Sequence, residues 1–437
     1  MIQSTSPASA AAIAAWPGLD DEERSRTFRG LTRNEREQLF LGLKASDQAG
    51  LLFTMPVHER FTYLRVLPPD DVADLIQEAP EEEREGLLNL LDLVVRAEVA
   101  ALLAYAEDRA GGLMNPRFAR LRPDMTVVEA ISYLRLQGRN METIYDVYVL
   151  DQDQRPIGVV SFRDLFTARG DATVSDVMNP QFISVKEETD QEEVARLFAA
   201  EGLAAIPVVD SEGRMKGIVT VDDIVDVVEE EATEDIQKFG GMEALDGPYL
   251  ETGFWQMVRK RAGWLAVLFL GEMLTATAMG RYEAEISKAV VLAVFIPLII
   301  SSGGNSGSQA STLIVRAMAL SELRLRDWWR VASRELMSGL ALGAVLASIG
   351  FARILAWQAV AKTYGEHYLL IAMTVAFSLV GVVLFGTLAG SMLPFILRRC
   401  RLDPASASAP FVATLVDVTG LVIYFSVAHF ILRGTLL

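Results

Sequence analysis

Five long apolar stretches dominate the last two-fifths of the chain, and short polar connections separate them. A transmembrane helix needs about 20 mainly apolar residues to cross the hydrocarbon of a bilayer. Each stretch comes close to this length or exceeds it, and the third and fourth are long enough to tilt or to extend beyond the bilayer. The pattern predicts five membrane-spanning helices at approximately residues 262–279, 289–314, 336–360, 369–397 and 411–432.

Residues 19–108 show a different pattern, in which apolar and acidic positions follow one another at helical spacing. Prolines such as Pro56 and Pro68 break the pattern into short segments. We therefore predict an all-helical N-terminal domain. We expect its carboxylates to lie on a solvated face, notably Asp70, Asp71 and Asp74.

An internal repeat occupies about residues 114–228, where Met114-Asn115-Pro116 returns as Met178-Asn179-Pro180. Further on, Gly158-Val-Val-Ser and a following Asp164 return as Gly217-Ile-Val-Thr and a following Asp223. Apolar runs and turn residues predict the order helix, strand, turn, strand, helix in both copies.

Composition agrees with a membrane protein that has a large cytoplasmic part. The chain has 437 residues, 51% of them hydrophobic, which is too long for one domain and too apolar for a purely soluble protein. The N-terminus lacks the basic start and apolar core of a signal peptide, so we expect the first half to stay in the cytoplasm. A single cysteine and three scattered histidines disfavour a disulfide and a zinc site, so a metal would be held by oxygen ligands.

Charge divides the chain into two halves, because residues 1–258 carry a net −24 and the remainder carries +7. An acidic half of this size repels nucleic acid and anionic lipid and can attract cations, although solubility alone would also explain it. Lys and Arg cluster before the first span, between the second and third, and between the fourth and fifth. The excess of basic residues on cytoplasmic loops predicts a cytoplasmic N-terminus and an extracytoplasmic C-terminus.

Two polar features interrupt the predicted spans. The second span contains a run of glycines and small polar residues from Ser301 to Gln309, which indicates either close helix packing or the lining of a pore that exposes Asn305. The fifth contains Asp417 near its middle, where an ionised carboxylate in lipid would cost several kcal/mol. A bound cation is the favoured counter-charge for Asp417. Glu272 in the first span is either paired at an interface or part of the pathway.

The segment from Asp222 to Asp235 joins the repeats to the first span and is rich in carboxylates. Spacings of three and four residues place several of them on one helical surface, where they repel one another unless a cation intervenes. We predict that this segment transmits cation sensing to the pore; a solvated charged helix is the alternative.

The tandem pattern of residues 114–228 resembles a pair of CBS domains. Such pairs act as regulatory modules that bind adenine nucleotides or ions, so the resemblance implies an intramolecular sensor, with an inert dimerisation scaffold as the alternative. Arg163 and Asp164 fall where nucleotide contacts are expected. Asp146 stands where a stacking aromatic would be expected, which disfavours binding of an adenine nucleotide.

Over nearly its whole length the chain resembles the MgtE magnesium channels. Four motifs carry the resemblance: Ala110-Gly-Gly-Leu-Met114, Glu231-Ala-Thr-Glu-Asp-Ile236, Gly303-Gly-Asn-Ser-Gly307 with Gln309, and Val412-Ala-Thr-Leu-Val-Asp-Val-Thr-Gly420. The resemblance implies a multi-domain α-helical membrane protein with four parts. They are an all-α N domain (residues 1–108), an α+β CBS pair (109–228), a connecting helix (229–258) and a pore domain of five transmembrane helices (259–437).

The resemblance also implies a mechanism and the residues for it. A homodimer in the inner membrane would conduct Mg²⁺ through a central pore, with Asp417, the Ala413 carbonyl and Asn305 holding a largely hydrated ion. High intracellular Mg²⁺ would close the pore by bridging cytoplasmic carboxylates. The implied regulatory ligands are Asp190, Glu192, Asp223, Asp226, Glu231, Glu234, Asp235 and Asp403.

The chain departs from the family pattern at several positions. Ser308 and Ala409 stand where the family has asparagines near the pore, and Gly202 and Leu203 replace an acid and an aromatic in the second CBS repeat.

Two other functions are compatible with the same architecture. One is transport of another divalent cation such as Co²⁺ or Mn²⁺, and the other is a membrane-anchored CBS sensor that conducts nothing. An enzyme is disfavoured because the chain shows neither a phosphate loop nor a nucleophile with its base.

Overall fold

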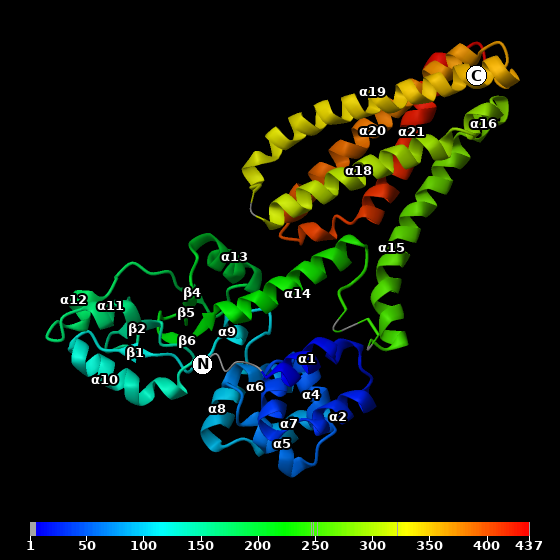
Figure 1. Ribbon diagram of the computed structural model, residues 1–437. Coiled ribbons are helices and arrows are strands. Elements are labelled where there is room, and N and C mark those ends of the chain that lie inside the picture. The colour runs from blue at the N-terminus through cyan, green and yellow to red at the C-terminus, as the bar shows by residue number, and fades with distance from the viewer. Residues whose placement is uncertain (1–5, 246, 248, 251, 321, 437) are drawn as a thin grey trace. The chain divides into compact units, whose positions relative to one another are not determined.

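The computed structural model of the chain describes residues 6–436 except 246, 248, 251 and 321. It separates into two compact units, Met1–Glu231 and Ala232–Leu437 (Figure 1). The first unit holds the helical domain and both repeats, and the second holds the predicted membrane part. The expected multi-domain, mainly helical architecture is confirmed.

The N-terminal domain consists of short helices, and proline begins several of them. Pro56 precedes α5 and Pro69 occupies the first turn of α6, where a residue without an amide hydrogen breaks no helical hydrogen bond. The elements are α1 (Pro7–Ala15), η1 (Trp16–Gly18), α2 (Asp21–Gly30), α3 (Arg33–Leu41), α4 (Ala45–Phe53), α5 (Val57–Leu64), α6 (Pro69–Glu78), α7 (Glu81–Leu90) and α8 (Leu93–Leu102).

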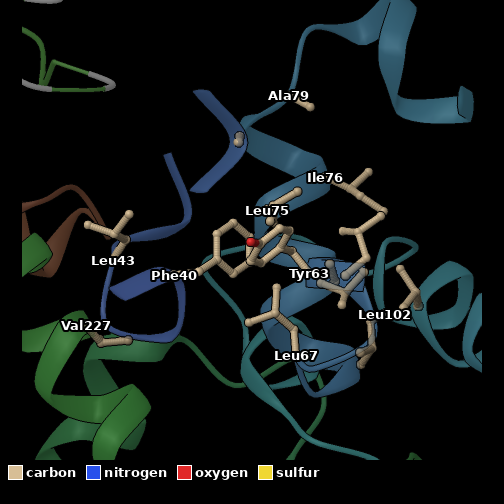
Figure 2. Close-up of a cluster of buried hydrophobic side chains, with 14 of the residues drawn as sticks. Phe40, Leu43, Tyr63, Leu67, Leu75, Ile76, Ala79, Leu102 and Val227 are labelled. Atoms are coloured by element: carbon tan, nitrogen blue, oxygen red, sulfur yellow. The ribbon is translucent and has the colours of Figure 1, made fainter. Parts of the chain in front are cut away.

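Aromatic and branched side chains from these helices form one core (Figure 2). The ring of Tyr63 lies 5.1 Å from that of Phe40, and Leu75 and Ile76 of α6 are fully buried beside them. Val227, from the long helix that follows the second repeat, belongs to the same cluster. The N-terminal domain and the second repeat therefore share a continuous hydrophobic core.

Each repeat contains the predicted order helix, strand, turn, strand, helix, and each has one further short strand ahead of its long first helix, which completes a three-stranded sheet. In both sheets the first strand is parallel to the second, and the second is antiparallel to the third. The first repeat comprises α9 (Ala110–Leu113), β1 (Arg120–Leu121), α10 (Val127–Gln137), η2 (Gly138–Asn140), β2 (Asp146–Leu150), β3 (Pro156–Ser161) and α11 (Phe162–Thr167). The second comprises α12 (Val174–Val177), β4 (Val185–Lys186), α13 (Gln191–Glu201), β5 (Ala205–Val209), β6 (Met215–Thr220) and α14 (Val221–Phe239).

The repeated Met-Asn-Pro segments tie the two copies together by reciprocal exchange. Asn115, ahead of the first repeat, exchanges backbone hydrogen bonds with Ile218 in the second, and Asn179 does the same with Val159 in the first. The close approach explains a repeated glycine, since a Cβ atom on Gly217 would lie 2.8 Å from the Asn115 carbonyl oxygen. The sequence repeat thus encodes a pairwise structural unit.

Helix α14 continues without interruption past the end of the second repeat, so the boundary that we drew at residues 228 and 229 lies inside one helix. A continuous helix is a stiff connection, and its carboxylates are held at fixed spacing along it. A turn-rich segment without strands or helices among its described residues follows and leads to the first membrane helix.

All five predicted spans coincide with helices long and apolar enough to cross a membrane. Helix α20 packs against α18, α19 and α21, and α15 packs mainly along α21 (Figure 1). The second span is broken before Ile296, where α17 ends and α18 begins with a proline in its first turn. The elements are α15 (Phe254–Arg281), α16 (Glu283–Lys288), α17 (Val290–Ala293), α18 (Ile296–Ala319), η3 (Leu325–Asp327), α19 (Trp328–Ala361), α20 (Tyr368–Arg399), η4 (Pro404–Ser406) and α21 (Ala409–Leu432).

Glycines bring α18 and α20 into backbone contact. Gly303 and Gly307 of α18 are buried and face Gly386 and Gly390 of α20. A Cβ atom on Gly307 would lie 2.8 Å from the Gly386 carbonyl oxygen, so a side chain there would push the helices apart. Close packing is therefore the correct interpretation for one face of the glycine-rich run.

Candidate functional site

The opposite face of α18 is polar and is not covered within a single chain. Ser301, Asn305, Gln309 and Thr312 are exposed, at the four- and three-residue spacing of one helical face. A membrane helix does not present such a row to lipid without cost, so this face borders water or another polar surface. The glycine-rich run thus serves two purposes on two faces, packing on one side and a polar lining on the other.

A cavity of ≈ 460 Å³ lies at this polar face, between α15, α18 and α21. Asn305, Ala413 and Asp417 all line this cavity. They are the three residues that the resemblance implies for the pore. The remaining lining residues are Glu272, Thr275, Met279, Ile296, Pro297, Ile300, Ser301, Gly304, Ser308 and Leu421. The three candidate pore residues are thus brought together although two different helices carry them.

Small residues let the three helices approach around the cavity. A Cβ atom on Gly271 of α15 would lie 2.7 Å from the Thr414 side chain of α21, and one on Gly304 of α18 would lie 3.6 Å from the Ala413 Cβ. At the start of α21 the indole of Trp264 donates a hydrogen bond to Ser408, the N-cap of that helix, over 3.2 Å. These contacts fix α15 and α18 against α21 and so set the position of Asp417.

Asp417 has a second carboxyl group beside it. It is half-buried, and its carboxyl group lies within hydrogen-bonding reach of Glu272 on α15. The lining of the cavity includes these two acids and no basic residue. The sequence left Glu272 between an interfacial and a pathway role, and the structure places it in the same cavity as Asp417.

Two of the departures from the family pattern meet in space. The Ser308 hydroxyl donates to the Ala409 carbonyl oxygen over 3.3 Å. These are the two positions at which the resemblance to MgtE channels led us to expect asparagines. The hydrogen bond joins α18 to the first turn of α21.

A second acidic cluster forms in the first unit, where α6 approaches the start of α14. The side-chain amide of Asn115 donates to Asp70 over 3.1 Å and to Glu142 over 2.7 Å. The expectation of a solvated face is wrong for Asp70, which is only 6% exposed. The reason is that α6 packs into the core on both sides of this residue, and only Asp71 and Asp74 retain partial or full exposure.

Burial and crowding of like charges change the acidity of this cluster. Burial, with repulsion from Asp223 and Asp71, raises the pKa of Asp70 to about 9. Burial also raises the pKa of Asp223 to about 7, against hydrogen bonds from Thr220 that lower it. Buried carboxylates that lie close to one another carry excess negative charge, so the binding of protons or of cations stabilises them.

Among the described side chains, no group of three or more Asp, Glu, His or Cys residues is placed to coordinate a metal ion in this arrangement. Asp223 and Asp226 lie on α14 opposite Asp71, whose pKa is raised to about 6 by burial and by repulsion from Asp222 and Asp226. The charges converge here without closing into a coordination sphere.

In the second unit a lysine stands between two of the implied regulatory ligands. The Lys238 ammonium of α14 pairs with Asp403, in the loop before α21, over 2.7 Å, and also with Glu234 one turn earlier. Burial lowers the pKa of Lys238, but the two hydrogen-bonded carboxylates outweigh this and raise it. Sequence reasoning missed Lys238, because its partner Asp403 lies 165 positions away.

The other implied ligands are found in ordinary local contacts. Asp190 caps α13 and pairs with Arg109 over 3.3 Å, and Glu192 lies 3.9 Å from Arg196 on the same helix. Glu231 accepts a hydrogen bond from Gln191 over 2.7 Å. Asp235 is half-buried one residue after Glu234 on α14. These residues are distributed along the two units rather than gathered in one site.

The candidate nucleotide residues are exposed at the start of α11. Ser161 caps this helix and donates to Asp164 over 2.6 Å, while Arg163 is exposed beside it. Burial, together with repulsion from Asp164, raises the pKa of Asp146. Asp146 and Asp164 are therefore close enough to repel one another at the start of α11.

Comparison with known proteins places these features in a family. Residues 296–427 match the MgtE family, described as divalent cation transporters, residues 7–108 match the MgtE intracellular N domain, and residues 110–171 and 174–230 each match a CBS domain. The chain is 45% identical to the magnesium transporter MgtE of Thermus thermophilus over 368 residues, which cover 84% of this chain and 80% of that protein.

Two further similarities are found. The magnesium transporter MgtE of Enterococcus faecalis is 35% identical over 337 residues, covering 77% of this chain and 72% of that protein. A crystal structure of the cytosolic domain of the Mg²⁺ channel MgtE in complex with ATP is 42% identical with a TM-score of 0.47, covering 50% of this chain and 90% of that one. By its sequence and its domain content, this chain belongs to the MgtE family of divalent cation transporters.

Proposed function

We propose that the protein is a Mg²⁺ channel or transporter of the inner membrane, with the cavity between α15, α18 and α21 as part of its ion pathway. The observation that carries this proposal is the convergence of Asn305, Ala413 and Asp417 on one cavity that has acids and no basic residue in its lining. The relatives that match most of the chain are named magnesium transporters.

The cavity suits an ion that keeps its water. Mg²⁺ dehydrates reluctantly and takes octahedral oxygen coordination. A cavity of ≈ 460 Å³ leaves room for the ion together with several of its waters. Carboxylate, amide and carbonyl oxygens can therefore hold the hydrated ion through its water shell.

We further propose that the chain acts as a homodimer with its N-terminus in the cytoplasm. The polar face of α18 and the loosely covered α15 support this, because only 6% of the most apolar window of α15 is buried within one chain. A second copy placed against these faces would close the pathway from lipid. The alternation of basic connections supports the orientation.

Gating follows from the two acidic regions. When intracellular Mg²⁺ is high, ions would neutralise the carboxylates at Asp71, Asp223 and Asp226 and those near Asp403, and the cytoplasmic elements would hold the pore shut. When it is low, repulsion between these carboxylates favours an open pore. Binding of adenine nucleotide by the CBS pair is not required for this scheme.

Uptake into proteoliposomes tests the function directly. We expect the native chain to carry Mg²⁺ when the cytoplasmic side is held at low Mg²⁺ and to stop when that side is raised to millimolar Mg²⁺. Co²⁺ and Mn²⁺ at equal concentration give the selectivity, and empty liposomes give the leak. Uptake no faster than the leak would refute conduction, and uptake that ignores internal Mg²⁺ would refute gating.

A further inference from the structure

Glu272 lies in an environment that a carboxylate does not occupy without a partner. It is in the membrane-spanning part of α15, where an ionised side chain facing lipid costs several kcal/mol. Its neighbour across the cavity is another acid, Asp417, within hydrogen-bonding reach. No Lys or Arg belongs to the described lining of the cavity. Among the described residues that line the cavity, the pair therefore has no basic counter-charge.

A buried hydroxyl group lies one turn from Glu272 on the same helix. Thr275 is 8% exposed, it lines the same cavity, and no described residue accepts or donates a hydrogen bond to its hydroxyl group. Buried hydroxyl groups are nearly always paired, so an unpaired one that faces a polar cavity indicates a missing oxygen-seeking ligand or water. This observation is independent of the two carboxyl groups.

The backbone holds these groups in place. Glu272, Thr275 and Met279 follow one another at three- and four-residue spacing, so one face of α15 borders the cavity. Next to Glu272, Gly271 allows α15 to approach α21, because a Cβ atom there would lie 2.7 Å from the Thr414 Cγ2 atom. The separation of the two acids is thus set by packing rather than by flexible side chains alone.

We propose that Glu272 and Thr275 complete a divalent-cation site with Asp417 within each chain, and that Glu272 selects divalent over monovalent cations. This inference rests on the proposed transport function and deepens it. Two carboxylates balance the charge of one divalent cation, whereas a single monovalent cation leaves a net negative charge in a medium of low dielectric constant. The Thr275 hydroxyl supplies a neutral oxygen to the ion or to its water shell.

The test compares single substitutions in the full-length protein in proteoliposomes, with low Mg²⁺ on the cytoplasmic side. For Glu272→Gln we expect the Mg²⁺ concentration at half-maximal uptake to rise on the order of tenfold, because affinity at oxygen sites follows the number of charged ligands. We also expect measurable Na⁺ uptake, which the native chain should exclude. Glu283→Gln, in the exposed helix α16, is the matched control and should behave as the native chain.

Thr275→Val separates a ligand from a structural residue. The substitution keeps the shape and removes a hydroxyl group that has no described partner, so thermal stability without Mg²⁺ should be unchanged or higher. The half-maximal Mg²⁺ concentration should nevertheless rise about two- to threefold, in line with the loss of one neutral hydrogen-bonding group. Unchanged affinity in this variant would remove Thr275 from the site.

The outcomes distinguish this inference from the proposed function. If the native chain carries no Mg²⁺, the proposed function fails, and the selectivity role of Glu272, which rests on that function, fails with it. If the native chain conducts while Glu272→Gln keeps native affinity and excludes Na⁺, the inference is overturned, and Glu272 and Asp417 merely share a proton. Size-exclusion profiles that match the native protein ensure that a lost activity reflects the site and not misfolding.

Discussion

At the scale of single residues, the informative positions are polar groups in places that exclude water. Asp417 and Asp70 both occur where a lone carboxylate is costly, one within a membrane helix and one in a protein core. The unusual position of Asp417 was recognisable from the sequence because the apolar residues around it predict a membrane-spanning helix. Asp70 was not, because the pair of acids at the start of α6 resembles an ordinary solvated helix terminus.

The pKa of Asp70 leads to a prediction about stability. Its ordinary value of 3.8 rises to about 9 in the folded chain, so the folded state holds this proton more tightly than the unfolded state does. The stabilisation is complete below pH 3.8 and declines as the pH rises toward 9. We therefore expect the native chain to melt at a lower temperature at pH 8 than at pH 5.

Substitution Asp70→Asn should raise the melting temperature at pH 8 by about 2 °C or more and reduce the difference between the two pH values. The amide oxygen can still accept the Asn115 hydrogen bond, and the amide needs no proton from solvent at pH 8 to remain neutral. Thermal unfolding of the purified protein in Mg²⁺-free buffer measures this, with exposed Asp153→Asn as the control. A lower melting temperature at pH 8 would show that the Asp70 charge is stabilised by the fold.

At the scale of elements, α14 is one continuous helix that begins at the end of the second repeat and extends to Phe239. Its first turns carry Asp223 and Asp226 against the N-terminal domain, and its last turn carries Lys238 against Asp403. An ammonium group thus neutralises carboxylates for which a divalent cation would compete. We expect the lysine to weaken Mg²⁺ binding at this end of the helix.

Substitution Lys238→Gln should therefore lower the cytoplasmic Mg²⁺ concentration that halves the flux, by a factor on the order of three to ten, which corresponds to the modest energy of a partly exposed ion pair. The measurement is uptake into proteoliposomes over a series of internal Mg²⁺ concentrations. Lys216→Gln, which removes an ion pair with Asp210 in the second repeat, is the control. An unchanged or higher inhibitory concentration would contradict competition by Lys238.

At the scale of the whole molecule, much of the architecture follows from long-range patterns in the sequence. The five spans and the paired repeats were predictable because hydrophobic length and a repeated motif are signals carried by many residues at once. The roles of the two faces of α18 were harder to predict, because Gly307, which packs against α20, and Asn305, which lines the cavity, belong to the same short run of residues. Only the position of α20 assigns each residue to its face.

The contacts that the sequence did not predict join residues far apart in the chain. Lys238 meets Asp403, Asn115 meets Asp70, and Glu272 meets Asp417. No local periodicity encodes such pairs, because they depend on how the helices pack after they form. The sequence could therefore single out Asp417 and Glu272 separately, while their meeting in one cavity became visible only with the fold.

The central claim is that Asp417 binds the conducted ion, and Mg²⁺ flux through Asp417→Ala tests it most directly. Native and substituted proteins would be reconstituted at equal density with low Mg²⁺ on the cytoplasmic side, and uptake would be followed with a Mg²⁺-sensitive dye. We predict that the substituted protein keeps the native size-exclusion profile and loses nearly all uptake. Native-like uptake by the folded variant would remove Asp417 from the pathway and contradict the account.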